Sequence, residues 1–304
     1  MRIDMSLQRL PYERTDDGVV TLWLEQPERP VVVLDSALLD AIDGALDEIG
    51  GGASGLVLAS RGRVFVAGAN LAEIMDLDDP GLDAYLKRGS AVFGRFATMP
   101  CTTVAALNGA ALGGGLELAM HCDRLLAAEP VSSDPSKPAK PYLIGLPEAG
   151  LSICPGWGGT CLLPARMDPA RAIAMTAAGT PMSVYDAAEA GLVEALVEPD
   201  RLMARALALA ATPKASARRE PISVAERERR GSAREALERV EAGLPATQAA
   251  HAVAACVRAG VDGGWGACLE AERANLIRLR HTEEGRGAIE SFFARSGGAR
   301  PGGG

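Results

Sequence analysis

Residues 109–119 read GAALGGGLELA, and residues 145–160 read GLPEAGLSICPGWGGT. Each stretch places one glutamate, Glu117 or Glu148, among glycines and apolar residues. Surface carboxylates usually have polar neighbours, so we expect both of these glutamates to be buried. Two buried carboxyl groups close to one another are typical of acid and base catalysis. The two stretches therefore predict an enzyme whose active site forms around Glu117 and Glu148.

The segments around these stretches predict an α/β fold. Runs of β-branched and apolar residues indicate strands at 19–24, 31–34, 55–60, 64–70 and 103–107. Apolar residues at helical spacing predict helices at 34–49, from 71 onward and at 82–99, the first with Asp35 or Ser36 as its N-cap. The repeated order strand, strand, helix is that of an α/β protein whose strand ends open onto glycines, where ligands commonly bind.

Composition divides the 304 residues into three parts. Residues 1–212 carry the α/β pattern, with an exposed loop expected at 129–141, where prolines, serines and lysines collect. Residues 213–295 form a helical C-terminal region, with helices predicted at 224–242, 247–259, 265–280 and 287–294. The glycine-rich tail 296–304 is expected to be disordered.

Charge and cysteine usage exclude several classes of function. A net charge of −8 disfavours binding to nucleic acid or to anionic lipid. The six cysteines form no CxxC pair, which predicts reduced, buried thiols and a cytoplasmic protein, and the three scattered histidines argue against a metal site. No stretch has the length of a signal peptide or of a membrane span, so neither is expected.

The triple glycine Gly113–Gly115 runs into an apolar helix. The first N–H groups of a helix have no partner within it, and glycines let an acceptor approach them closely, so this turn predicts an oxyanion site. A second donor is expected from residues 67–70, another strand end before a helix. The alternative is that the glycines only allow a helix to pack tightly on a strand.

The two glutamates have opposed surroundings. Glu117 lies in the first turn of its helix, where the macrodipole favours the ionised form of a base that activates water. Glu148 is flanked by apolar residues, which should raise its pKa and keep a proton available. The alternatives are a helix-capping charge for Glu117 and, for Glu148, a loop carboxylate that accepts backbone N–H groups.

Three long strings carry a family resemblance. They are FVAGANLAEI (65–74), ALNGAALGGGLELAMHCD (106–123) and GLPEAGLSICPGWGGTCLLPAR (145–166), and AAEAGLVEALV (187–197) follows them. Together they resemble the signature regions of the crotonase, or enoyl-CoA hydratase/isomerase, superfamily, in that family's order. The C-terminal part is similar to the helices that close the hydratase module of the bifunctional fatty-acid oxidation complex α-subunit, without its dehydrogenase domain. The fold implied is a crotonase-type spiral of repeated β-β-α units.

The resemblance implies a role for each matching residue. The N–H groups of Ala69 and Gly114 would form the oxyanion hole for the thioester oxygen. Glu117 would activate the water that attacks Cβ, and Glu148 would give a proton to Cα. The residues implied to contact substrate or CoA are Ala67, Gly68, Asn70, Leu71 and Ala72.

The activity implied is enoyl-CoA hydration, the reversible syn addition of water to a trans-2-enoyl-CoA in fatty-acid β-oxidation or related acyl-CoA degradation. No metal or other cofactor is implied, because coenzyme A is part of the substrate. Family members are commonly trimers or dimers of trimers, and a separate 3-hydroxyacyl-CoA dehydrogenase or thiolase subunit is a further candidate partner. The alternatives are a Δ3,Δ2-enoyl-CoA isomerase, in which Glu148 moves the proton, and a non-catalytic assembly subunit.

Three departures from the family pattern bear on the site. Asn70 stands where aspartate is usual, and Ser152 stands where glycine is common, which matters if that backbone requires a positive φ. The connection between Glu117 and Glu148 is longer than usual by about one short loop. We therefore expect the 129–141 insert to lie beside the active site and to narrow or reshape the access of the acyl chain.

Overall fold

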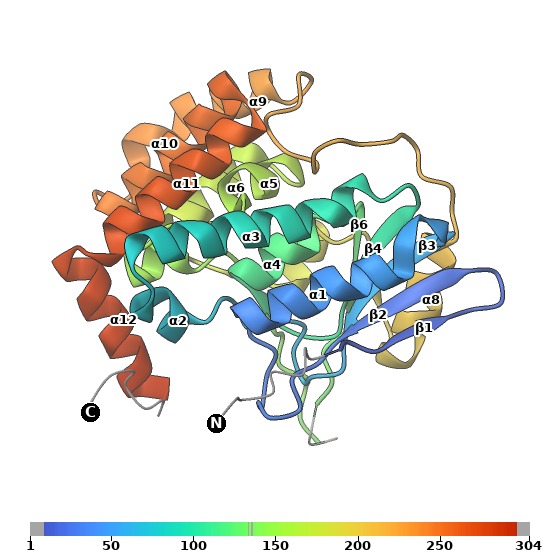
Figure 1. The fold of residues 1–304 in the computed structure, drawn as a ribbon. Helices are drawn as coiled ribbons and strands as arrows, with labels where there is room; N and C mark the ends of the chain where they lie inside the picture. Colours follow the sequence, from blue (N-terminus) through green and yellow to red (C-terminus); the bar gives the residue numbers. More distant parts are fainter. Residues whose placement is uncertain (1–8, 133, 135, 297–304) are drawn as a thin grey trace.

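The computed structural model describes residues 9–132, 134 and 136–296 (Figure 1). Its main sheet has six strands in the order β1-β2-β3-β4-β6-β9. They are β1 (Tyr12–Arg14), β2 (Val19–Leu24), β3 (Gly55–Ser60), β4 (Thr102–Leu107), β6 (Arg124–Ala128) and β9 (Leu196–Val197). β1 pairs with β2 antiparallel, and the other neighbours are parallel. β3 and β4 are buried along their whole length, as strands covered on both faces must be.

Helices cover both faces of this sheet. On one face, α8 (Leu202–Ala210) packs on alternate strand residues such as Val57 and Val104. On the other face, α1 (Ser36–Ile49), α3 (Asp79–Thr98) and α4 (Gly114–Met120) enclose the largest apolar cluster (Figure 1). Asp35 caps α1 by accepting the N–H of Leu38 at 2.9 Å, which confirms one of the two predicted caps.

A second, three-stranded sheet brings the two glutamate-bearing stretches together. It consists of β5 (Ala111–Leu112), β7 (Leu143–Gly145) and β8 (Met182–Ser183). β5 and β7 run parallel, with Leu112 opposite Gly145, and the N–H of Gly113 donates to the carbonyl of Gly145 at 2.9 Å. Parallel strands end at the same edge of a sheet. The turn that starts α4 and the 3-10 helix η2 (Glu148–Leu151) therefore emerge side by side.

Helices from the C-terminal half form a layer that packs partly on α3 (Figure 1). They are α9 (Arg230–Val240), α10 (Gln248–Gly263), α11 (Trp265–Arg280) and α12 (Glu283–Ser296), with the earlier α5 (Gly159–Leu162) and α6 (Pro169–Ala178) beneath. The short helices α2 (Leu71–Asp76) and α7 (Val184–Glu189) complete the α-helical elements of the described chain. Leu276 of α11 belongs to the same apolar cluster as strand residues, so this layer shares the main core.

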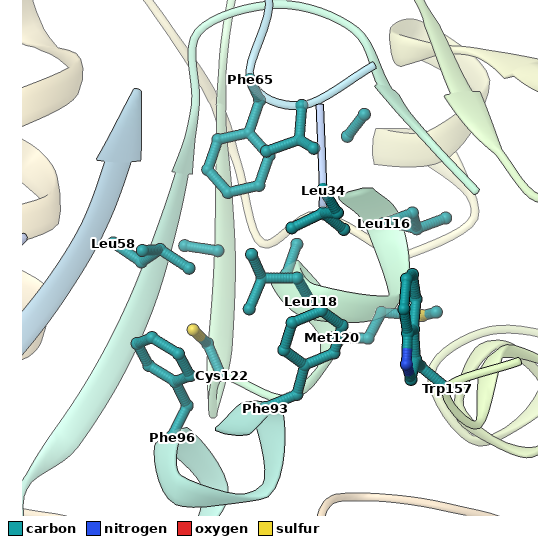
Figure 2. Close-up of a cluster of buried hydrophobic side chains, with 14 of the residues drawn as sticks. Leu34, Leu58, Phe65, Phe93, Phe96, Leu116, Leu118, Met120, Cys122 and Trp157 are labelled. Carbon is teal, nitrogen blue, oxygen red and sulfur yellow. The ribbon is translucent and has the colours of Figure 1, made fainter. Parts of the chain in front are cut away.

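Aromatic side chains concentrate around α4 (Figure 2). The ring of Trp157 lies 5.2 Å from that of Phe93, and its indole N–H donates to the carbonyl of Leu86 at 3.1 Å. A Cβ on Gly114 would lie 2.4 Å from the Trp157 ring. The absence of a side chain at Gly114 therefore lets the ring of Trp157 reach the start of α4.

The structure confirms the α/β class and changes several predicted elements. The strands at 19–24 and 55–60 occur as predicted. The predicted strands at 31–34 and 64–70 were wrong, because these segments form only the isolated bridges Leu34–Ala69 and Val66–Ala111. Gly68, at a φ of +121°, interrupts the extended conformation there. The helix predicted from residue 224 begins at Arg230.

One cysteine pair also corrects the sequence analysis. A disulfide joins Cys161 of α5 to Cys268 of α11, so the prediction that all six thiols are reduced was wrong for these two. Cys101, Cys122, Cys154 and Cys256 are free and buried. The pairing could not be seen in the sequence, since the two cysteines are 107 residues apart and meet only through helix packing. The division of the chain at residues 212 and 295 stays a prediction, and 297–304 of the predicted disordered tail lie outside the described residues.

Ser152 carries backbone strain directly after η2. Its φ of +57° and ψ of +27° are left-handed, and among the described residues it is the one non-glycine residue with a positive φ. The position thus requires the conformation that the sequence analysis considered. A side chain in this region costs about 1–2 kcal/mol relative to glycine.

We expect Ser152→Gly to stabilise the protein by about 0.5–1 kcal/mol, because relief of this strain exceeds the added entropy of glycine in the unfolded chain. Urea unfolding measures the change. Ser152→Ala is the matched control, since alanine keeps the Cβ and should give no gain. Equal stabilities of the glycine and alanine variants would contradict the assigned strain.

Candidate active site

A cavity of about 380 Å³ opens where the β5–α4 turn, the segment before α2 and η2 meet. Both predicted glutamates line it, as do both predicted oxyanion donors, Ala69 and Gly114. Of the residues implied to contact substrate or CoA, four line the cavity: Ala67, Gly68, Asn70 and Leu71. Ala72 does not line it, and its N–H is taken by the side chain of Asn70 at 3.2 Å.

The N–H groups of the two predicted oxyanion donors have no backbone partner in the described elements beside them. Leu34 donates to the carbonyl of Gly68 at 2.9 Å and accepts the N–H of Asn70 at 2.7 Å. Successive residues of an extended chain direct their polar groups to opposite sides, so the N–H of Ala69 points away from Leu34, toward the cavity. Gly114 is the first residue of α4, where an N–H has no partner within the helix. Both residues line the same cavity.

Glu117 is enclosed and held by a neighbouring backbone segment. It is 1% exposed, and its Oε1 accepts the N–H groups of Trp157 and Gly159, each at 2.8 Å. Burial raises the pKa of Glu117 well above its usual range, the carboxyls of Glu272 and Glu148 raise it further, and the two N–H groups oppose them. The predicted first-turn position is confirmed, but burial outweighs the helix dipole that was expected to favour ionisation.

Glu148 presents its carboxyl group to the start of α4. The residue as a whole is half-buried, but its Oε2 is fully enclosed and has no hydrogen-bond partner among the described residues. Burial raises the pKa of Glu148 to about 8, with a further contribution from Glu272, so the group is protonated at neutral pH. Its setting is that of a proton donor, as the apolar sequence around it predicts.

The triple glycine serves packing as well as access. A Cβ on Gly113 would lie 2.5 Å from Oε1 of Glu148, and one on Gly115 would lie 2.5 Å from the carbonyl oxygen of Val66. Gly113 also has a φ of +52°. Close packing and an exposed N–H group are thus not alternatives, because the same absence of side chains provides both.

Two departures from the family pattern have clear places in the structure. The side-chain oxygen of Asn70 accepts the N–H groups of Ala72 and Glu73, so the residue is the N-cap of α2. The expectation that the 129–141 insert narrows the cavity is not supported, because none of its described residues lines it. The hydroxyl of Tyr142 donates to the carbonyl of Ala128 at 2.6 Å, which closes the two ends of the insert.

Sequence reasoning missed a third buried glutamate, Glu272 of α11. Its carboxylate accepts the N–H groups of Gly158 and Thr160 and the hydroxyl of Thr160. A signal for it exists in the sequence. Glu272 follows Cys268 by four residues and precedes Leu276 by four, so helical spacing places it on the buried stripe of this helix.

Comparison with known proteins assigns this arrangement to a family. The profile described as enoyl-CoA hydratase/isomerase matches residues 14–243. The chain belongs to this family. The family match covers both glutamates and both predicted oxyanion donors, while α10, α11 and α12 lie beyond it.

Relatives within the enoyl-CoA hydratase/isomerase family resemble different lengths of the chain. A probable enoyl-CoA hydratase of Bacillus subtilis (strain 168) is 36% identical over 183 residues, which are 59% of this chain and 65% of that protein. The fatty acid oxidation complex subunit alpha of Shewanella halifaxensis is 30% identical over 296 residues, 92% of this chain and 40% of that protein. The matches thus span less than two thirds of either relative.

Solved structures of enoyl-CoA hydratases have the same fold. One from Bacillus anthracis is 25% identical, with a TM-score of 0.59, covering 95% of this chain and 97% of that one. An enoyl-CoA hydratase/isomerase from Mycobacterium paratuberculosis has a TM-score of 0.64 at 19% identity, covering 95% and 100%, which is a likeness of fold. These neighbours confirm the predicted crotonase-type fold. Within the described part of the chain, every helix is too short or too polar to cross a bilayer.

The raised pKa of Glu148 makes stability depend on pH. Between the unfolded pKa of about 4.3 and the folded value of about 8, the folded protein keeps a proton that the unfolded chain releases. Stability therefore falls as pH rises through this window.

We expect Glu148→Gln to weaken this dependence, to which Glu117 and Glu272 also contribute because burial raises their pKa values. The gain in stability of the variant over the parent should therefore be much larger at pH 9 than at pH 5. Urea unfolding at both values tests it. Glu189→Gln, at an exposed position of α7, is the control and should follow the parent. Parallel curves for the parent and Glu148→Gln would show that Glu148 does not carry the proton.

Proposed function

We propose that this family member is an enoyl-CoA hydratase, which adds water reversibly to a trans-2-enoyl-CoA and gives a 3-hydroxyacyl-CoA. The observation that carries the proposal is the content of one cavity: two buried carboxyl groups in different settings and two backbone N–H donors. Hydration needs a base for the water, an acid for Cα and a site for the enolate oxygen. The cavity supplies all three.

The geometry suggests how the groups divide the reaction. The thioester oxygen binds the N–H groups of Ala69 and Gly114, where its charge is stabilised as the enolate forms. Glu117 is fixed through Oε1, so Oε2 is the oxygen that accepts a proton from water as the water oxygen bonds to Cβ. The electron pair of the double bond moves toward the thioester, and Cα takes the proton of Glu148. A raised pKa makes Glu117 a stronger base once it is ionised.

The apolar lining supports an acyl-CoA as the substrate. Besides the polar groups above, the cavity is lined by Leu71, Ile74, Leu86, Leu151, Ile153, Leu276 and Phe293. A hydrocarbon chain gains about 25 cal/mol for each Å² of apolar surface removed from water in such a place. We propose that the acyl chain lies against these side chains, and that no metal or separate cofactor takes part.

The remaining expectations about partners stay proposals. We propose a homo-oligomer, a trimer or a dimer of trimers, and Leu143 and Tyr185 support it, since both are large, apolar and more than two fifths exposed (44% and 48%) on contacting elements. A separate 3-hydroxyacyl-CoA dehydrogenase or thiolase would use the product. The cytoplasmic location likewise stays a prediction.

We expect Glu117→Gln and Glu148→Gln each to lower the rate of crotonyl-CoA hydration by about 10²–10⁴-fold, because each removes one proton transfer. The loss of absorbance of the conjugated thioester measures the rate, and Glu189→Gln should retain it. A parent protein that leaves crotonyl-CoA unchanged but converts a 3-enoyl-CoA to the 2-enoyl isomer would be an isomerase. No turnover of either thioester would favour the assembly-subunit alternative.

A further inference from the structure

Four consecutive backbone N–H groups, those of residues 157–160, donate to two buried carboxyl groups in alternation. Trp157 and Gly159 donate to Oε1 of Glu117, each at 2.8 Å. Gly158 and Thr160 donate to Glu272, at 2.5 Å and 2.9 Å. The segment enters the short helix α5, where N–H groups lack partners within the helix. Each carboxyl group thus accepts hydrogen bonds from alternate N–H groups of the same stretch of backbone.

Glu272 is distant from this segment in sequence but contacts it in the folded protein. It is 0% exposed, lies 114 residues from Gly158 in sequence, and also accepts the hydroxyl of Thr160 at 2.6 Å. It does not line the cavity that contains Glu117 and Glu148. Glu272 therefore cannot touch a substrate there. It can act on the reaction through its hydrogen bonds to residues 157–160 and through its charge, which raises the pKa of Glu117 and of Glu148.

The segment has little freedom to adjust. Gly158 has a φ of +98°, and a Cβ at this position would lie 2.0 Å from the ring of Trp265, which is also on α11. Gly158 lies between the two residues whose N–H groups hold Glu117. A movement of Gly158 toward or away from α11 therefore turns the adjoining peptide units and redirects those N–H groups.

We infer that Glu272 is a positioning residue for the proposed general base: it fixes residues 157–160 from the side of α11, so that Trp157 and Gly159 hold Glu117 with Oε2 free for water. The inference rests on the proposed function, because Glu117 must be the base for its orientation to matter in turnover. It assigns part of the active-site geometry to the C-terminal helices, beyond the matched family region.

Other charged and titratable groups near the two carboxyls do not replace this role. Burial lowers the pKa of His121 to about 4, so the ring that contacts the Glu117 carbonyl is neutral. Burial also raises the pKa of Tyr85 well above its usual range, so it too is neutral. The groups near Glu272 are the Glu148 carboxyl, the Cys154 thiol and Arg273, which follows Glu272 on α11. The Arg166 guanidinium lies elsewhere, at the C-terminal end of α4, where it donates to the carbonyl of Met120.

The test compares Glu272→Gln with Glu270→Gln, an exposed change on the same helix. Glutamine keeps one acceptor oxygen but replaces the other with an NH₂ group. The N–H group of either Gly158 or Thr160 then loses its acceptor. We expect Glu272→Gln to lower kcat/KM for crotonyl-CoA hydration about 10–100-fold, since small displacements of a catalytic group have effects of this size. Glu270→Gln should match the parent.

A double variant separates positioning from a general loss of folded protein. If Glu272 acts through Glu117, adding Glu272→Gln to Glu117→Gln should lower the residual rate less than about 3-fold, because the residue it positions is already gone. The same 10–100-fold loss in both backgrounds would overturn the inference. So would a Glu272→Gln variant with parental activity.

Amide hydrogen exchange gives a readout that does not require turnover. In Glu272→Gln, the N–H groups of Trp157 and Gly159, which bond to Glu117 rather than to Glu272, should exchange at least 10-fold faster than in the parent. Unchanged protection at these two positions would overturn the inference even if activity fell. A parent without hydratase activity would refute the proposed function and the catalytic part of the inference, whereas an active parent with an unaffected variant would refute the inference alone.

Thr160→Val provides a second variant if Glu272→Gln does not fold. It removes only the hydroxyl donor to Glu272 and keeps the shape of the buried side chain. We expect the same pattern at a smaller size, about a 3–10-fold loss of kcat/KM that disappears in the Glu117→Gln background. An equal loss in both backgrounds would again overturn the inference.

Discussion

Four buried N–H groups in a row, at residues 157–160, must find acceptors, because an unpaired donor in a protein interior costs about 1–3 kcal/mol. In the described part of the chain, these residues belong to neither sheet, and α5 is too short to satisfy the N–H groups internally. Carboxylates from α4 and α11 accept them instead. The position of the proposed base is thus a by-product of satisfying the backbone, and the same hydrogen bonds join the strand-and-helix core to the C-terminal helices.

The glycines allow the close packing on which this arrangement depends. Gly113 lets the Glu148 carboxyl reach the start of α4, Gly114 admits the ring of Trp157, and Gly159 leaves space for the Glu117 carboxyl. A side chain at any of them would occupy space already filled by a proposed catalytic group or by the wall of the cavity. The same close contacts position the two glutamates and pack the core, so a substitution at one of these glycines would disturb both.

Much of this could be predicted from the sequence, where the information is local. Apolar runs placed β2 and β3 correctly, Asp35 marked the start of α1, and the glycine stretches identified both cavity glutamates. Bridges such as Leu34–Ala69 could not be distinguished from strands, because their apolar composition is the same and the difference lies in the φ of Gly68. Glu272 and the Cys161–Cys268 disulfide escaped notice because both depend on how α11 packs on α5.

The reach of Glu272 across 114 residues has a consequence for how the protein becomes active. During synthesis, the strands and α4 can collapse before the last helices leave the ribosome, and such an early globule already contains both cavity glutamates. It lacks half of the acceptors for residues 157–160. Contacts of such long sequence separation form late and slowly. The proposed active site would therefore be complete only once α11 has packed on α5.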